Sequence, residues 1–333
     1  MNNPKVSVIM SVYNGEKYVR EAMDSILTQT HKDFELIIIN DGSTDRTQEI
    51  LETFNDVRIR VVQQENLGLI KSLNKAIRMA KGEYIARHDA DDISLPERFK
   101  KQVDFLEKHR GIALVGTFVI QIDEDGKEVK IYKSSTENKD IKDALWHDVP
   151  VCHASIMCRK ECMEKVGLYR EKLKFVEDYD LLFRISEAFD VANIGEPLYR
   201  VRINPDSICA RNRFDQHRRY SLVRMLAKER RANGRDRLND LTEEDIDELL
   251  DDIMPKTRRN EKRILASNCC YLAEVSYCVG NYARAKEWLL RSIYTDLFAK
   301  RSWILFFKLL MRWILPPRLI KRRSGELFKE FPR

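Results

Sequence analysis

The sequence predicts an α/β protein with a mostly parallel central sheet, helices on both faces of that sheet, and an all-helical C-terminal region. Three observations support this prediction. Short apolar runs alternate with segments of helical apolar spacing over the first 120 residues. Polar clusters follow several of the apolar runs. From about residue 204 the pattern is helical throughout.

The first half of the sheet is predicted by four apolar runs, each followed by a helical pattern. Ser43 or Thr44 can cap the second helix, and Pro96 suits the first turn of the fourth. In chain order we expect a strand at 6–12, a helix at 19–27, a strand at 34–39, a helix through 50–54, a strand at 58–62, a helix at 69–80, a strand at 84–86 and a helix at 99–106.

The second half of the sheet begins with a predicted hairpin, because apolar runs at 113–122 and 127–132 flank Glu124-Asp125-Gly126. Further strands are expected at 155–158 and 198–203, with a helix at 177–189 between them. In parallel sheets ligands bind beyond the carboxyl ends of the strands. The polar residues that follow strands in this chain are therefore expected to share one edge of the sheet.

We divide the chain into a catalytic domain at 1–205 and a helical region at 206–333, in which 260–293 should form a helical hairpin turning at Gly280-Asn281. The charge balance of 59 Lys and Arg against 53 Asp and Glu suits a cytoplasmic protein. Seven cysteines without a C-x-x-C pair argue against disulfides and zinc. We expect no signal peptide, no transmembrane helix and no nucleic-acid binding.

Two aspartates after the fourth strand are the candidate metal ligands. Asp89 and Asp91 form an Asp-x-Asp pair whose carboxylates can reach one hard cation, Mn²⁺ or Mg²⁺, shared with a substrate diphosphate. A common surface turn has the same composition.

Asp41, at the end of the second strand, could accept a hydrogen bond from a nucleotide base or ribose, or could cap a helix. Neither a G-x-G-x-x-G nor a P-loop motif occurs, which disfavours dehydrogenases and P-loop ATPases.

Four segments together resemble family 2 glycosyltransferases of the GT-A fold, over roughly residues 4 to 205. They are VSVIMSVYNG at 6–15, NDGSTD at 40–45, ARHDADD at 86–92 and VEDYDL at 176–181. The likeness is closest to bacterial enzymes of capsule, O-antigen or exopolysaccharide assembly. It implies inverting transfer of a sugar from a nucleotide-sugar, usually UDP-linked, to a hydroxyl of a glycan or lipid-diphosphate-linked acceptor.

The resemblance also implies roles for individual residues. The metal would be held by Asp91 with Asp89, and the general base would be Asp178. The residues in contact with the donor nucleotide would be Ser11, Tyr13, Asp41, Lys71 and Asp89. The acceptor side would include His153, Glu177 and Arg202. Purely structural roles remain possible for Asp178 and for the acceptor-side residues. Acidic residues at 177–178 also favour a helix N-terminus, a lone histidine is often a structural hydrogen bonder, and a strand-end arginine can simply be solvated.

The C-terminal segment at 300–323 joins an apolar stretch, WILFFKLLMRWIL, to a cluster of basic residues. It is too short to span a bilayer and suits an interfacial helix on an anionic membrane surface, at the inner face of the cell membrane. Packing on the catalytic domain or on a second copy is the alternative. Two other functions are weighed against the transferase: a sugar-nucleotide nucleotidyltransferase, and a non-catalytic membrane-peripheral scaffold.

Overall fold

The computed structural model describes residues 3–203, 212–298 and 302–306, and it divides into two compact units. One unit comprises the chain up to Asn204 together with Asp215–Ile253, and the other comprises Pro205–Phe214 and the chain from Met254 onward. The catalytic-domain prediction of 1–205 covers the larger part of the first unit. The segment 300–323 lies largely outside the described residues.

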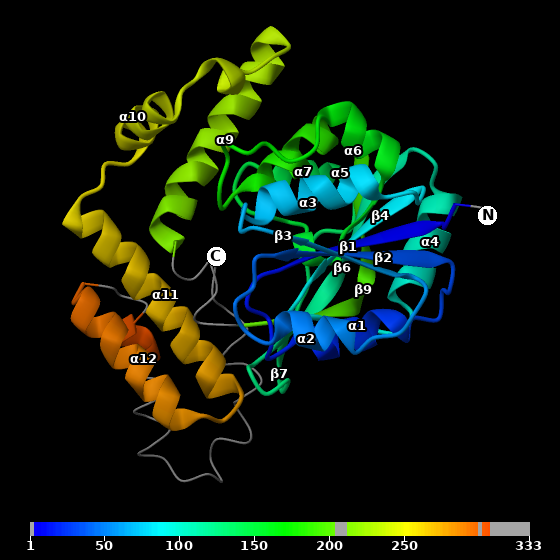
Figure 1. The fold of residues 1–333 in the computed structure, drawn as a ribbon. Coiled ribbons are helices and arrows are strands. Elements are labelled where there is room, and N and C mark those ends of the chain that lie inside the picture. The colour runs from blue at the N-terminus through cyan, green and yellow to red at the C-terminus, as the bar shows by residue number, and fades with distance from the viewer. Residues whose placement is uncertain (1–2, 204–211, 299–301, 307–333) are drawn as a thin grey trace. The chain divides into compact units, whose positions relative to one another are not determined.

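A mixed sheet forms the centre of the first unit, with the described strands in the order β3-β2-β1-β4-β8-β6-β9-β5 and with β7 paired to β6 (Figure 1). The run β3-β2-β1-β4 is parallel, as predicted, whereas β8 joins β4 and β6 in antiparallel fashion. The strands are β1 Val6–Val12, β2 Phe34–Asp41, β3 Ile59–Gln64, β4 Tyr84–Asp89, β5 Ile93–Ser94, β6 Ile112–Ile122, β7 Glu128–Tyr132, β8 Met157–Arg159 and β9 Asp190–Arg202.

Helices cover both faces of this sheet, and alternation along the strands assigns each side chain to one face (Figure 1). Ile9 of β1 packs in the cluster that includes α3 and α7, whereas Val8 and Met10 pack against α1 and α4. The helices of this part are α1 Val19–Leu27, α2 Thr47–Glu52, α3 Leu69–Met79, α4 Arg98–Lys108, α5 Asn138–Ala144, α6 Lys160–Val166 and α7 Glu177–Ala188, with a short 3₁₀ turn at His153–Ser155.

Two later helices also belong to the first unit, although the sequence places them in the C-terminal region. They are α9 Arg213–Asn233 and α10 Glu243–Ile253, and Leu222, Leu226 and Ile246 on them are buried in the α3–α7 cluster. Burial of these apolar side chains is the physical reason for the assignment. The second unit contains α11 Arg258–Cys278 and α12 Tyr282–Thr295, the predicted helical hairpin, with Gly280 at φ 84° in the turn.

A buried ion-pair network on α7 joins the helices on this side of the sheet. Asp180 is fully buried and accepts from Arg170 Nε at 3.0 Å and from Arg184 Nε at 2.9 Å. Arg170 continues to Asp236, beyond α9, at 2.7 Å. The two arginines hold the pKa of Asp180 below its usual range, against the opposing effect of burial. The network therefore ties the segment after α9 to α7.

Asp180→Ala is expected to lower the free energy of unfolding by about 3–5 kcal/mol, because it leaves two buried guanidinium groups without their shared carboxylate. Urea denaturation at pH 7 measures this. Asp104→Ala, in the exposed pair with Lys100, is the control and should cost less than about 1 kcal/mol. Because the folded-state pKa of Asp180 is depressed, its contribution exists above the unfolded pKa of about 3.9 and is lost as the pH falls below it.

Candidate active site

Three parallel strands bring the first predicted residues to one edge of the sheet. Ser11 of β1 lies in register with Ile39 of β2 on one side and with Asp89 of β4 on the other. Tyr13 directly follows β1, and its side chain is 52% exposed, free to face a ligand. Asp41 is the last residue of β2. The strand register thus places Ser11, Tyr13, Asp41 and Asp89 at the same edge.

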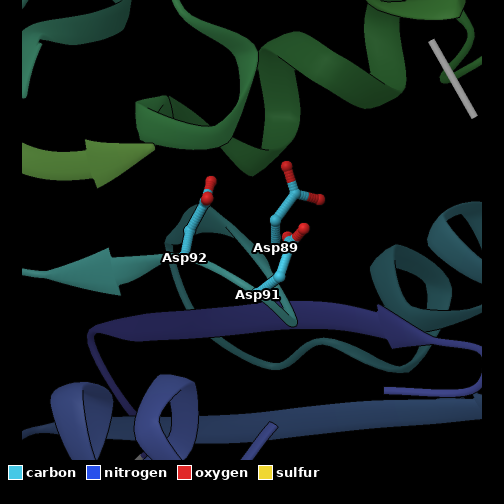
Figure 2. A group of neighbouring side chains, drawn as sticks. All are labelled: Asp89, Asp91 and Asp92. Carbon is cyan, nitrogen blue, oxygen red and sulfur yellow. The ribbon is translucent and has the colours of Figure 1, made fainter. Parts of the chain in front are cut away.

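Three carboxylates gather on the turn after β4. Oxygen atoms of Asp89, Asp91 and Asp92 lie within 4.8 Å of one another, and Figure 2 shows the three side chains rising from this turn to the same side. Burial and the neighbouring charge of Asp89 raise the pKa of Asp91 to about 6. Burial, with the charges of Asp91 and Asp89, also raises the pKa of Asp92. Closely spaced hard oxygen donors whose charges repel one another fit a divalent cation.

Two arginines hold this acidic turn in place. Arg87, buried on β4, forms an ion pair with Asp89. Arg202, at the end of β9, donates its backbone N–H to Asp92 Oδ1 at 2.8 Å and its Nε–H to the carbonyl oxygen of Asp91 at 2.9 Å. The guanidinium of Arg202 also donates to Glu21 Oε2 at 2.6 Å. Arg202 therefore lies under the turn, where its donors are engaged with the protein.

Glu177 and Asp178 lie in the first turn of helix α7. Burial is the main cause that raises the pKa of Asp178, and the charge of Asp89 adds to it while Arg87 opposes it. Burial and the neighbouring Asp178 raise the pKa of Glu177 to about 7. The charges of Asp89 and Arg87 influence the pKa of both side chains, so Glu177 and Asp178 lie within electrostatic reach of the Asp-x-Asp pair.

Asp41 organises the wall of the predicted nucleotide site. Its Oδ1 accepts from Leu67 N at 2.9 Å and from Gln64 Nε2 at 2.7 Å, and its Oδ2 accepts from Gly68 N at 2.9 Å. These three hydrogen bonds engage both carboxylate oxygens with the protein, and Asp41 is 3% exposed. Gly68, at φ 90°, begins helix α3. The carboxylate of Asp41 therefore fixes this loop rather than capping the helix that follows β2.

The two remaining predicted residues, His153 and Lys71, form no ion pair with the aspartates of the turn after β4 in the described part of the chain. His153 lines a small cavity together with Asp178, and its Nε2 lies 2.6 Å from the hydroxyl of Tyr169. Burial and the charge of Arg87 hold the pKa of His153 well below its usual range, so the ring is neutral at pH 7. Lys71 is an exposed residue of α3, and its Nζ lies 4.0 Å from Glu171. In the described part of the chain, no ion pair links Lys71 to the aspartates.

Two residues of the site, Arg87 and Asp92, are not among the predicted ones. Both lie inside the ARHDADD segment, and the sequence holds one signal for each. Strand alternation places Arg87 on the same face as Asp89. A third aspartate directly beside the Asp-x-Asp pair offers an additional carboxylate within reach of the same cation.

Comparison with known proteins identifies the family. The family model described as "Glycosyl transferase family 2" matches residues 7–167. The EpsE protein of Bacillus subtilis (strain 168), named as a glycosyltransferase, is 39% identical over 219 residues, which are 63% of this chain and 77% of EpsE. The chain belongs to glycosyltransferase family 2. The chain is also similar to the amylovoran biosynthesis glycosyltransferase AmsE of Erwinia amylovora, with 35% identity over 61% of this chain and 77% of AmsE.

Solved structures agree on the fold of this family 2 enzyme. TarS of S. aureus (residues 1–349, in complex with UDP-GlcNAc) superposes with a TM-score of 0.56 at 19% identity, covering 90% of this chain and 92% of TarS. The mannosyltransferase PcManGT of Pyrobaculum calidifontis, in complex with GDP-Man and Mn²⁺, gives 0.53 at 17% identity, covering 93% and 87%. The GT-A prediction is confirmed. The protein is a glycosyltransferase related to polysaccharide biosynthesis enzymes.

Proposed function

We propose that this glycosyltransferase moves one sugar, with inversion at the anomeric carbon, from a UDP-sugar to a hydroxyl of a glycan or lipid-diphosphate-linked acceptor in surface polysaccharide assembly. The observation that carries the proposal is the gathering of Asp89, Asp91 and Asp92 on one turn, together with Asp178, whose pKa the charges of Asp89 and Arg87 influence. The complexes of TarS with UDP-GlcNAc and of PcManGT with GDP-Man support a nucleotide-sugar donor. Family membership favours this function over a nucleotidyltransferase or a non-catalytic scaffold.

Mn²⁺ or Mg²⁺ is the proposed cofactor, and Asp91 is its principal ligand. Asp89 is already paired with Arg87, and Asp92 already accepts from Arg202, so the carboxylate of Asp91 is the least committed of the three. The complex of PcManGT with Mn²⁺ supports a metal in this fold. When bound, the cation would neutralise the diphosphate that leaves the sugar.

Asp178 is the proposed general base. It stands at the start of α7, within electrostatic reach of Asp89. An acceptor hydroxyl that attacks the anomeric carbon opposite the diphosphate would need a base at such a position. Its carboxylate would accept the hydroxyl proton as the new glycosidic bond forms. Displacement at one face, with no covalent enzyme intermediate, inverts the anomeric configuration. The neutral His153–Tyr169 pair would border the acceptor on the same side.

Cleavage of the donor tests the proposal directly. Purified protein should release UDP from one member of a panel of UDP-sugars in the presence of Mn²⁺, and EDTA should abolish the release. A parallel panel of GDP-sugars checks the nucleotide. Turnover that is equal with Mn²⁺ and with EDTA would reject the metal, and turnover with GDP-sugars alone would reject the UDP assignment. No nucleotide release from either panel, with or without acceptor glycans, would contradict the function.

The rate should depend on pH through the α7 carboxylates. We expect kcat/KM to rise with pH on the acidic side and to level off once Asp178 is ionised. Burial and the charge of Asp178 raise the pKa of Glu177 to about 7, so Glu177 is uncharged in the acidic range where Asp178 ionises. Glu177→Gln should therefore leave the acidic limb of the profile in place. A pH series of UDP release measures both profiles, and loss of the acidic limb in Glu177→Gln would exclude Asp178 as the titrating group.

An anionic membrane surface is the proposed partner of the second unit. Among the described residues, no helix combines the length and the apolar composition that a membrane span needs. Leu297 and Phe298 are nevertheless 62% and 91% exposed beyond α12, next to the basic and apolar segment 300–323. The protein should co-sediment with phosphatidylglycerol vesicles more than with phosphatidylcholine vesicles, and Leu297→Ser with Phe298→Ser should weaken this. Equal sedimentation with both vesicles would contradict the assignment.

A further inference from the structure

A groove along helix α9 carries cations that the protein itself does not neutralise. We name it the α9 groove, and its walls are Trp146 on one side and Ser221, Arg224, Lys228 and Arg231 on the other. It consists of two adjoining hollows of about 490 and 550 Å³ that share Trp146 and Lys228. The helix residues recur at intervals of three, four and three, which places them on one face of α9.

The basic residues of this groove differ from the other arginines of α9. Arg218 pairs with Asp251, and Arg230 pairs with Glu187 and Asp236. In contrast, within the described part of the chain no carboxylate forms an ion pair with Arg224, Lys228 or Arg231. The guanidinium of Arg231 lies 4.4 Å from the ring centre of Trp146, which holds it at the groove wall. The groove is therefore a preformed site of uncompensated positive charge.

The α9 groove leads away from the proposed general base. Near its N-terminus, α9 contacts the start of α7, because Gln216 Nε2 donates to the carbonyl of Phe175 at 3.0 Å and the ring of Tyr220 lies 5.0 Å from that of Tyr179. Near its C-terminus, Arg230 Nε lies 2.6 Å from Glu187 of α7. The two helices thus run in the same direction, and the groove starts beside Tyr179, the neighbour of Asp178.

The spacing of the cations indicates what the groove can bind. Burial and the charge of Asp148 raise the pKa of the Tyr179 hydroxyl, and a hydrogen bond from Arg224 lowers it. Arg224 is thus engaged with Tyr179, whereas Lys228 and Arg231, further along the helix, are more available to bind an anion. From Arg224 to Arg231 the helix rises about 10 Å, at about 1.5 Å per residue. Two neighbouring phosphates fit within this length. Guanidinium and ammonium groups bind phosphate oxygens with charge-assisted hydrogen bonds.

We infer that the α9 groove binds the phosphate-bearing part of the acceptor, so that the acceptor is a diphosphate or phosphodiester whose hydroxyl reaches Asp178. The inference rests on the proposed function, because it takes Asp178 as the base. It goes beyond that function by assigning an anion subsite to Lys228 and Arg231. It also predicts that uncharged glycans of the same sugar composition are poor acceptors.

Binding of diphosphate probes to the full chain tests this subsite. Inorganic pyrophosphate and farnesyl diphosphate are titrated in EDTA, so that no metal holds diphosphate at the aspartate turn. The fluorescence of Trp146 reports binding, and Trp146→Phe should abolish the signal. The double variant Lys228→Gln with Arg231→Gln should weaken both probes about tenfold. The matched control, Lys108→Gln with Arg110→Gln at exposed positions on and beside α4, removes the same charge and should bind within twofold of the wild type.

Two further measurements separate the possible outcomes. Metal-dependent release of UDP without acceptor should be unchanged in the double variant, because neither residue belongs to the donor site. A wild type that cleaves no donor would contradict the proposed function, whereas undiminished probe binding in the double variant would overturn the α9 groove inference alone. Stronger binding of farnesyl diphosphate than of pyrophosphate would support a lipid-linked acceptor, and equal binding would support a phosphate recognised without its lipid.

Discussion

Asp178→Asn is expected to lower kcat for sugar transfer by a factor of about 10² to 10⁴ while the fold and donor binding are retained. The amide keeps the size of the side chain but cannot take a proton from the acceptor hydroxyl. Burial raises the pKa of Asp178, which means that the charged carboxylate is disfavoured at this position, so a neutral amide of the same size should not destabilise the first turn of α7. Steady-state transfer of a radiolabelled sugar measures the loss.

Two controls make the result for Asp178 specific. Glu177→Gln changes the adjacent carboxylate to its amide and should retain much of kcat at neutral pH, since Glu177 is not the proposed base. The KM for the donor should change little in Asp178→Asn, because Asp178 lies on α7 and the proposed nucleotide contacts lie at the end of β1, β2 and β4. Normal turnover by Asp178→Asn, or an equal loss in both variants, would refute the assignment.

Asp91→Ala should abolish tight Mn²⁺ binding and lower kcat/KM on the order of 10³-fold, because the leaving diphosphate loses the cation that neutralises its charge. Mn²⁺ titration followed by electron paramagnetic resonance measures the affinity without reference to activity. Asp125→Ala, in the exposed hairpin turn between β6 and β7, is the matched control and should leave both quantities unchanged.

The other two carboxylates of the turn should differ from Asp91 in degree. Asp89→Ala also releases Arg87 from its buried ion pair, and Asp92→Ala removes the acceptor for the backbone N–H of Arg202, so stability should fall in both variants. Asp91→Ala should not lower the melting temperature, since its removal relieves repulsion. Unchanged Mn²⁺ affinity in Asp91→Ala would exclude Asp91 as a metal ligand.

The sequence was sufficient to predict the parallel half of the sheet and the edge at which the site forms. Four apolar runs with intervening helical spacing lead directly to β1–β4, and Asp41 and Asp89 end two of these strands. The other half, in which β8 is antiparallel and β9 is parallel to β6, was less predictable, because the positions of β8 and β9 depend on long-range pairing. Met157 pairs with both Ala86 and Val115, and no local pattern encodes such contacts.

The same limit applies to the electrostatics of the site. The Asp-x-Asp pair and Asp178 were found through motifs, whereas the role of Arg202 required the folded chain. An arginine at the end of a strand is expected to be solvated. Arg202 is instead buried against the turn that contains Asp92, 110 residues earlier in the sequence. Likewise, apolar positions on α9 do not reveal that this helix packs on α7, so the α9 groove could not be foreseen.

Arg202 has a mechanical consequence for the enzyme. Its guanidinium donates to the carbonyl oxygens of Asp123 and Glu124 as well as to that of Asp91, at 3.1, 3.0 and 2.9 Å. Through these hydrogen bonds Arg202 connects the solvent-facing turn between β6 and β7 to the turn that carries the aspartates. Shortening or lengthening that tip should therefore displace the turn that carries Asp91. Substitutions in a hairpin distant from the aspartates would in this way change the affinity of the enzyme for its donor.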